Sequence, residues 1–187
     1  ILGFIALRKW SGPRPIGIRP AMIGMVLAVG FGVCGLMIPW MKTMTLARQA
    51  EQFSRHYMEV VALGHNEFAL ELQKDYINRF SEKMSLREHY LADTRSQQAL
   101  EEFRENNFNE LIRKRGPNAE WVLAAPIRVF HRYQREHADV IWMDPTGEIS
   151  AKLFFRLDYR VDSKGQGQWN VGTATMYREP IVADSIL

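Results

Sequence analysis

The chain is poor in the residues that carry covalent or redox chemistry. Its 187 residues include one cysteine, Cys34, which lies inside a long apolar run. The rest of the chain therefore has no disulfide framework and no thiol nucleophile. The net charge is only +3, and lysine and arginine are not gathered in a stripe interleaved with aromatic residues. Nucleic-acid-binding surfaces usually need such a stripe, so we expect no nucleic-acid partner.

Motifs for metal or nucleotide binding are also scarce. The histidines are His56, His65, His89, His131 and His137. None of them has the spacing of an HExxH site or of a paired Cys/His site, so we predict no metal and no cofactor. The glycines between residues 165 and 172 lie between two expected strands with no helix after them. They indicate a hairpin turn and not a nucleotide-binding loop.

The carboxylates give no clear acid–base site. Asp158 shares one side of an expected strand with Arg156 and Arg160, which favours ordinary ion pairing on a solvated surface. The opposite side of that strand is apolar and indicates core. We therefore predict that the protein is not an enzyme. A pocket for a small apolar ligand is an alternative use of the aromatic residues, although such residues more often fill a core; they are Phe154, Phe155, Tyr159, Trp169 and Tyr177.

One long run has no charge at all. Residues 21–41 contain no charged side chain and are bracketed by Arg19 and Lys42. At about 1.5 Å per residue the run spans roughly 30 Å, the thickness of the hydrocarbon core of a bilayer. It ends in Pro39, Trp40 and Met41 and not in the small residues of a signal-peptide cleavage site. We therefore predict a single transmembrane helix over residues 21–41.

The charges beside this run predict its orientation. Four basic residues without an acid precede it, and three basic residues mixed with glutamates follow it: Arg8, Lys9, Arg14 and Arg19, then Lys42, Arg48 and Arg55. The positive-inside rule then places residues 1–20 in the cytoplasm or at its interface, and residues 42–187 in the periplasm of an inner-membrane protein. The apolar stretch Ile1–Leu7 is either the end of an earlier membrane helix or an interfacial segment.

Four glycines lie within the expected membrane helix, namely Gly24, Gly30, Gly32 and Gly35. Small residues let a second transmembrane helix approach closely, so these positions are predicted helix–helix contacts in the membrane. The alternative is that lipid simply tolerates glycine there.

Beyond the membrane the pattern is first helical. Apolar residues recur at steps of three and four from Leu46 to Val61, and Gly64 should end that helix. Asn66 is expected to cap a second helix whose apolar side repeats every four residues, with Phe68, Leu72, Tyr76 and Phe80.

Two further helix starts are marked by capping-box spacing. Ser85 with Glu88 predicts a short helix, and Thr94 with Gln97 predicts a longer one. The longer helix should continue to the basic residues 113–115 and stop at Gly116.

From Glu120 onward the apolar period changes to two, which is typical of strands. The clearest strand is expected over residues 151–162, with its odd-numbered residues, Val161 included, on the core side. Turns at residues 144–147 and 163–167 predict antiparallel neighbours over 140–143 and 169–177. An earlier strand is expected over 127–134, entered through 121–125.

This order predicts an α+β fold, in which one transmembrane helix is followed by a helical layer packed on a curved antiparallel β-sheet. The expected parts are 1–20, 21–41 and 42–187. The helix break at Gly64, His65 and Asn66, followed by a helix and later by long antiparallel strands, resembles the nuclear transport factor 2-like (cystatin-like cone) superfamily over roughly residues 43–179. The resemblance implies a cone-shaped domain, and the superfamily includes enzymes, binding modules and scaffold subunits.

A membrane helix before such a domain is also similar to inner-membrane assembly factors of type IV secretion systems. Those usually carry an Asn-Pro-x-Gly motif near the end, and this chain has none. We therefore predict a non-catalytic accessory, scaffold or assembly subunit of a larger membrane protein complex. Its partners would be the lipid bilayer and other subunits, contacted through the membrane helix and the α+β domain. The alternatives are a membrane-tethered cone domain that binds or transforms a small apolar ligand, and a type IV secretion-like assembly factor.

Overall fold

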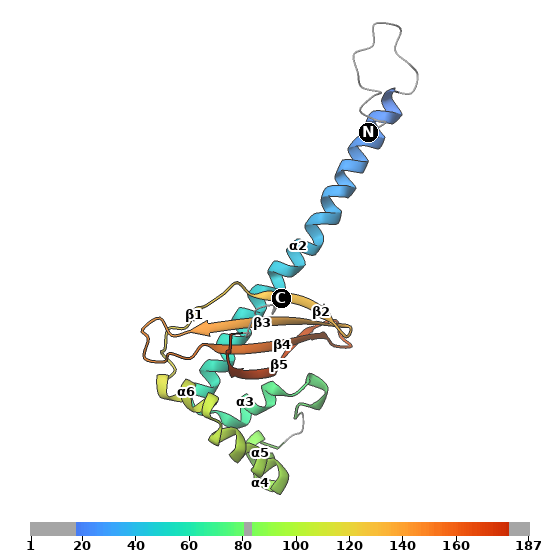
Figure 1. Ribbon diagram of the computed structural model, residues 1–187. Coiled ribbons are helices and arrows are strands. Elements are labelled where there is room, and N and C mark those ends of the chain that lie inside the picture. Colours follow the sequence, from blue (N-terminus) through green and yellow to red (C-terminus); the bar gives the residue numbers. More distant parts are fainter. Residues whose placement is uncertain (1–17, 81–83, 180–187) are drawn as a thin grey trace, which may run out of the picture. The chain divides into compact units, whose positions relative to one another are not determined.

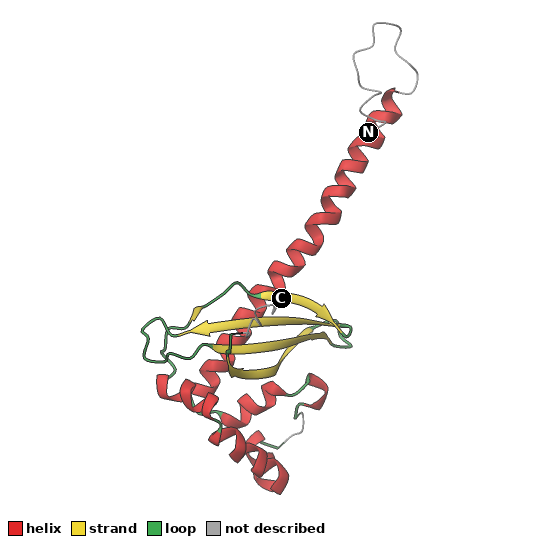
Figure 2. Ribbon diagram, in the orientation of Figure 1, coloured by secondary structure: helices red, strands yellow, loops and turns green. Residues whose placement is uncertain are grey.

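The computed structural model describes residues 18–80 and 84–179 (Figure 1). Two units are distinguished, Ile1–Thr45 and Leu46–Leu187. The described residues form a long apolar helix, further helices and a five-stranded antiparallel sheet that is not closed (Figure 2). The predicted α+β class is therefore confirmed. The expectations for Ile1–Leu7 and for the basic residues 8–14 lie outside the described residues.

Helix α2 (Ile18–Ala62) supplies the whole described part of the first unit, residues 18–45. It is the one helix among the described residues that is long and apolar enough to cross a membrane, and its most apolar stretch is not buried. Pro39 lies inside the helix. Proline lacks an N–H, so the carbonyl of Gly35 loses its usual helical partner there. One turn later, the hydroxyl of Thr43 donates to the carbonyl of Pro39 at 3.0 Å.

In the second unit, the remainder of α2 confirms the predicted apolar stripe. Its buried side chains include Leu46, Ala50, Tyr57 and Val61, each at most 5% exposed. The helix ends at Ala62, and Gly64 has a φ of +78°. Glycine adopts that left-handed conformation without strain, which explains the stop at this position.

The next helix departs from the prediction. Helix α3 (Asn66–Gln73) is preceded by His65, and Asn66 does not cap it but accepts a hydrogen bond from Arg113 at 3.1 Å. The four-residue repeat is also wrong, because Phe68 is 52% exposed and the chain leaves the helix after Gln73. Glu71 accounts for this exit. Its Oε2 accepts the backbone N–H of Phe80 at 2.8 Å, which draws the chain back through the short 3-10 helix η1 (Tyr76–Asn78).

Three helices follow: α4 (Leu86–Ala92), α5 (Thr94–Glu105) and α6 (Asn107–Arg115). The capping box of Ser85 and Glu88 is confirmed. The cap predicted at Thr94 is wrong by one residue, because Asp93 accepts from the N–H of Ser96. The prediction of one long helix from Thr94 to residues 113–115 is also wrong. Asn106 interrupts it by accepting from the N–H of Phe108 at 2.9 Å, although the predicted end before Gly116 is confirmed.

The sheet contains β1 (Val122–Leu123), β2 (Arg128–Arg132), β3 (Arg135–Met143), β4 (Leu153–Val161) and β5 (Gly167–Met176). The order is β1-β3-β4-β5, and β2 also pairs with β3, so β5 is an edge strand. All pairs are antiparallel, as predicted. A bulge beside Arg156 and Leu157 shifts the register between β4 and β5.

The inner face of the sheet forms the core. Leu153, Phe155 and Leu157 are fully buried, which confirms the predicted core side of β4. The Phe155 ring meets the edge of the Tyr57 ring at 5.8 Å, and Trp142 Nε1 donates to Ser54 Oγ of α2 at 3.1 Å. Val161 was expected on this side, but it is 52% exposed because it pairs with Gly167 at the hairpin end of the strand.

Candidate interaction surfaces

The four glycines of α2 do not share one side of the helix. At about 100° per residue, Gly24, Gly32 and Gly35 fall within a sector of about 80°, while Gly30 points to the opposite side. A Cβ atom added at any of the four positions would meet nothing within 4 Å. Three of the four predicted contact residues can therefore serve a single helix partner, and Gly30 cannot join them.

His137 is the most constrained of the histidines. Its Nδ1 lies 2.7 Å from Asp158 Oδ1, its Nε2 lies 3.0 Å from the carbonyl oxygen of Arg132, and its ring stacks on Phe130. Each ring nitrogen of His137 therefore has a polar partner, and which of the two donates depends on the tautomer. The two contacts and the stacking on Phe130 fix the orientation of the ring.

The partner of Asp158 corrects the sequence-based expectation. Asp158 contacts His137, whereas Arg156 makes a two-point contact with Asp139 at 2.8 and 2.9 Å and Arg160 lies 3.4 Å from Asp75. The cross-strand register explains the difference, since His137 lies opposite Asp158 and Asp139 lies opposite Arg156. Directly opposite residues are closer than neighbours along the same strand.

The other histidines show no metal-ligating arrangement. His56 lies 3.8 Å from Glu59, His131 lies 3.4 Å from Glu136, and the His89 ring stacks on Phe80. His65 is exposed at the start of α3. In the part of the chain that the structure describes, no three His, Cys, Asp or Glu side chains are grouped closely enough to hold a metal ion.

The outer face of the sheet carries alternating cations and aromatic rings. The guanidinium carbon of Arg156 lies 5.5 Å from the Phe130 ring centre and 5.6 Å from that of Phe154. Phe154 in turn lies beside Tyr177, and Lys152 lies over the Tyr177 ring at 5.9 Å. We call this surface the arginine–aromatic face; it comprises Arg128, Phe130, Arg132, His137, Lys152, Phe154, Arg156, Arg160 and Tyr177.

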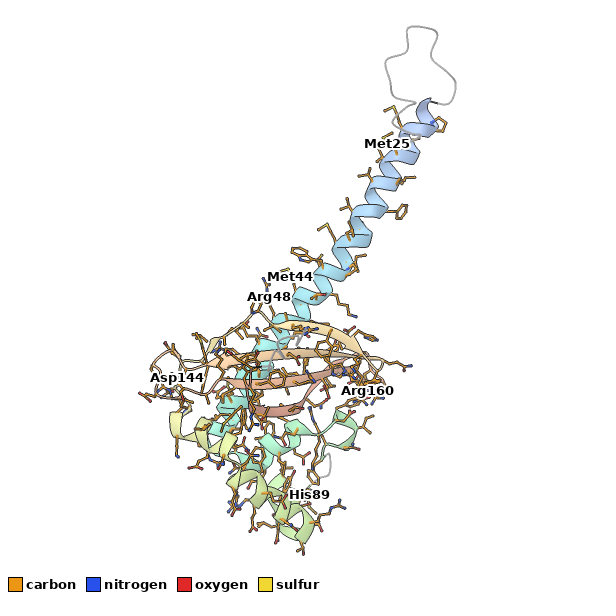
Figure 3. All side chains as sticks on the ribbon, in the orientation of Figure 1. Met25, Met44, Arg48, His89, Asp144 and Arg160 are labelled. Atoms are coloured by element: carbon orange, nitrogen blue, oxygen red, sulfur yellow. The ribbon has the colours of Figure 1, made fainter. Side chains whose placement is uncertain are left out.

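Burial on this face is partial. The Arg156 and Arg160 side chains are 42% and 41% exposed, and Phe130, Phe154 and Tyr177 are half-buried. In Figure 3, the labelled Arg160 lies at one end of the sheet and the labelled Asp144 lies at the opposite end. Contacts of arginine with aromatic rings hold both groups in fixed positions while leaving their surfaces accessible.

The aromatic residues that suggested a ligand pocket do not form one surface. Phe155 and Trp169 lie in the core, with Tyr159 packed against it, while Phe154 and Tyr177 belong to the arginine–aromatic face. The inner group fills the space between α2 and the sheet, where Phe155 also meets Phe108 at 5.3 Å. The stripe therefore divides between the core and the surface.

A buried carboxylate that the sequence did not reveal organises the helical side. Glu71 Oε1 accepts from Tyr90 Oη and from Lys74 Nζ, both at 2.6 Å. Burial alone would raise the pKa of Glu71, but the hydrogen bonds from Lys74, Tyr90 and the Phe80 N–H outweigh it and hold the pKa below its ordinary value. Nearby, burial raises the pKa of Tyr57, whose hydroxyl accepts from Gln73 at 2.8 Å. Glu71 is thus an ionised structural group with its lone pairs in use.

A second such carboxylate anchors the loop between β3 and β4. Burial would raise the pKa of Asp144, but donors from Thr146, Arg115 and the Ile149 N–H hold it well below its usual range. Arg115 Nη2 lies 2.9 Å from Asp144 Oδ1, and the Asp144 side chain is fully buried. The group shapes the turn that the sequence predicted over residues 144–147.

Among the described residues of the second unit, open grooves include the following two. One, of about 720 Å³, is lined by residues of α2, α3, α4 and α5, among them Phe68 and Leu86, and by Leu63 in the turn after α2. The other, of about 660 Å³, runs between the junction of α5 and α6 and the end of β5. Its lining is Asn106, Asn107, Phe108, Phe154 and residues 174–178. No sequence signal could have located either groove, because each joins segments that are far apart in the chain.

Comparison with known proteins leaves the chain without an assigned relative. No family model, no curated protein and no solved structure matches it.

Proposed function

We propose that this chain is a non-catalytic accessory, scaffold or assembly subunit of a larger membrane protein complex. The observation that carries the proposal is the arginine–aromatic face, on which Arg156, Phe130 and Phe154 are ordered but accessible. Arginine and aromatic side chains are enriched at protein–protein interfaces and dominate their binding energy. Such a face suits a protein partner.

The apolar half of α2 supports a membrane-bound complex. In this proposal it spans the inner membrane over residues 21–41, with residues 1–20 on the cytoplasmic side and the α+β domain in the periplasm. Gly24, Gly32 and Gly35 then offer a side on which a neighbouring transmembrane helix can pack closely. The proposal includes a helical layer over a curved sheet, as in the cone-shaped superfamily that the sequence resembles.

Two features favour a binding role over catalysis. The inner face of the sheet is filled by core side chains such as Phe155 and Trp142, both fully buried. His137 and Asp158 are the pair closest to an acid–base arrangement. They contact each other, and His137 also contacts the carbonyl oxygen of Arg132. These features support a domain that acts through its surface.

The test is extraction of the full chain from its native membrane in mild detergent, followed by native mass spectrometry. We expect the chain to be recovered with stoichiometric partner subunits. Gly24→Leu and Gly35→Leu should each reduce partner recovery several-fold, because leucine blocks close helix approach. Gly30→Leu is the matched control, since it makes the same change on the opposite side of the helix.

Replacing His65 or His131 should leave assembly intact, because these exposed side chains have no assigned chemistry. Recovery of the chain as a lone monomer that binds or transforms a small molecule would overturn the proposal and favour the tethered-pocket alternative.

A further inference from the structure

Among the strands that the structure describes, none covers the far edge of β5, because the order β1-β3-β4-β5 ends there. The hydrogen-bond pattern shows which residues face that edge. The Tyr177 N–H donates to the carbonyl of Lys152 at 2.7 Å, and the register pairs Thr175 with Phe154 and Thr173 with Arg156. In an antiparallel pair, residues alternate between facing the partner strand and facing away. The backbone groups of Ala174 and Met176 therefore face outward.

The two ends of this edge differ. Near the start of β5, the outward carbonyl of Trp169 accepts from the guanidinium of Arg79, so that part is covered. At the other end, the outward N–H and C=O groups of Ala174 and Met176 have no partner within residues 18–80 and 84–179. Thr173, Thr175 and Met176 are exposed, and residues 173–176 include neither a charge nor a proline, which natural sheets use to protect their edges.

The 660 Å³ groove lies along this uncovered end. Ala174 and Met176 form part of its lining, and Asn106, Asn107 and Phe108 form the opposite wall. Phe154 and Tyr177 line it from the outer face of the sheet. A groove between a strand edge and a helix suits one extended chain, whose side chains would alternate between the helical wall and the arginine–aromatic face.

The charge of the groove indicates the chemistry of its occupant. Arg178 is the one charged side chain among the described lining residues, and it is exposed. The first turn of α6 contains Glu110, and the Phe108 N–H already donates to Asn106, so the start of this helix adds no free positive charge to the groove. Arg178 is the feature that favours an acidic group in the bound segment.

We propose that the β5 edge binds an extended, acidic segment of another subunit as an added antiparallel or parallel strand, paired with Ala174 and Met176 and placed between β5 and the α5–α6 junction. This inference rests on the proposed function, because it requires a partner subunit. It adds the mode of binding and the kind of segment that binds.

The experiment compares residue-resolved amide hydrogen exchange of the detergent-solubilised full chain alone and in the extracted complex. The amides of Ala174 and Met176 should exchange at least about tenfold more slowly in the complex, because the added strand bonds them. The Thr175 amide is the internal control, since it already faces β4 and should change little.

Variants test the same edge by assembly. Met176→Pro removes an outward donor and obstructs an incoming strand, and should reduce partner recovery at least tenfold. Met176→Thr keeps the donor and should therefore reduce partner recovery much less than Met176→Pro does. Arg178→Glu, at an exposed position that does not affect the ladder, should weaken recovery several-fold through charge repulsion, and it keeps the test valid if the proline variant fails to fold.

The outcomes separate the two proposals. Partners recovered with unchanged Ala174 and Met176 exchange, and with normal assembly of Met176→Pro and Arg178→Glu, would overturn the strand-addition proposal alone. Absence of any partner would overturn the proposed function. Protection of the edge in a complex that contains only copies of this chain would assign the edge to self-association and overturn the commitment to a different subunit.

Discussion

At the scale of single residues, buried polar groups decide the local path of the chain. Glu71 is 6% exposed, yet it holds three donors from Lys74, Phe80 and Tyr90. A carboxylate with so many donors is stable only when it is ionised. Its contacts join α3 to α4 across the 3-10 turn, which is why the apolar repeat of that region fails to predict its structure.

We expect Glu71→Gln to reduce the free energy of unfolding by about 1–3 kcal/mol at neutral pH, because one donor loses its acceptor. The folded-state pKa of Glu71 is lowered, so the carboxylate stabilises the fold above its unfolded pKa of about 4.3 and loses that contribution as the pH falls through the folded value. The difference between the parent and Glu71→Gln should therefore be largest near pH 7 and shrink below about pH 4.

Thermal unfolding of the full chain in detergent over this pH range measures the effect. Glu101→Gln is the matched control, since Glu101 is exposed on α5. A pH-independent difference between the parent and Glu71→Gln would contradict the role of the ionised carboxylate.

At the scale of elements, caps determine where the helices begin and break. Asn106 accepts from the Phe108 N–H, and Asn109 donates to the Phe103 carbonyl at 2.8 Å, so two amide side chains secure the junction of α5 and α6. We expect Asn106→Ala to cost about 1 kcal/mol of stability, as for other helix caps. Asn107→Ala, an exposed neighbour, should cost clearly less. Chemical denaturation of both variants checks this, and equal effects would contradict the capping role.

The elements that the sequence predicted well are those whose signal is local. Alternation along β4 and the capping box of Ser85 and Glu88 depend on residues only two or three positions apart. Asp93 and Thr94 are both good capping types, and the contact with Ser96 decides between them. Local pattern alone could not settle that choice.

The candidate site was less predictable because it depends on distant segments. His137 meets Asp158 only through the register of β3 and β4, and the β5 groove joins residues 106–108 to residues 174–178. The glycines of α2 could be found from the sequence. Their division between two sides of the helix follows only from the angular position of each residue around the helix axis. The resemblance to the cone-shaped superfamily stays a prediction.

At the scale of the whole molecule, the prediction concerns topology. The flanking charges favour residues 42–187 outside the cytoplasm. A reporter that is active only in the cytoplasm should therefore be inactive when fused after Leu187, and one that is active only outside should be active there. The reverse result would overturn the orientation. Fusing both reporters after Ala62 provides a control, because this position ends α2.

The contribution of α2 to the core also has a consequence for the order of events during synthesis. Ser54 meets Trp142, 88 residues later, and Gln49 meets Trp169, 120 residues later. The stripe from Leu46 to Val61 leaves the ribosome before any of the strands that will cover it. The stripe is thus translated before its partners in the sheet, and its apolar side stays open to chaperones, or to wrong partners, until β3, β4 and β5 have been translated.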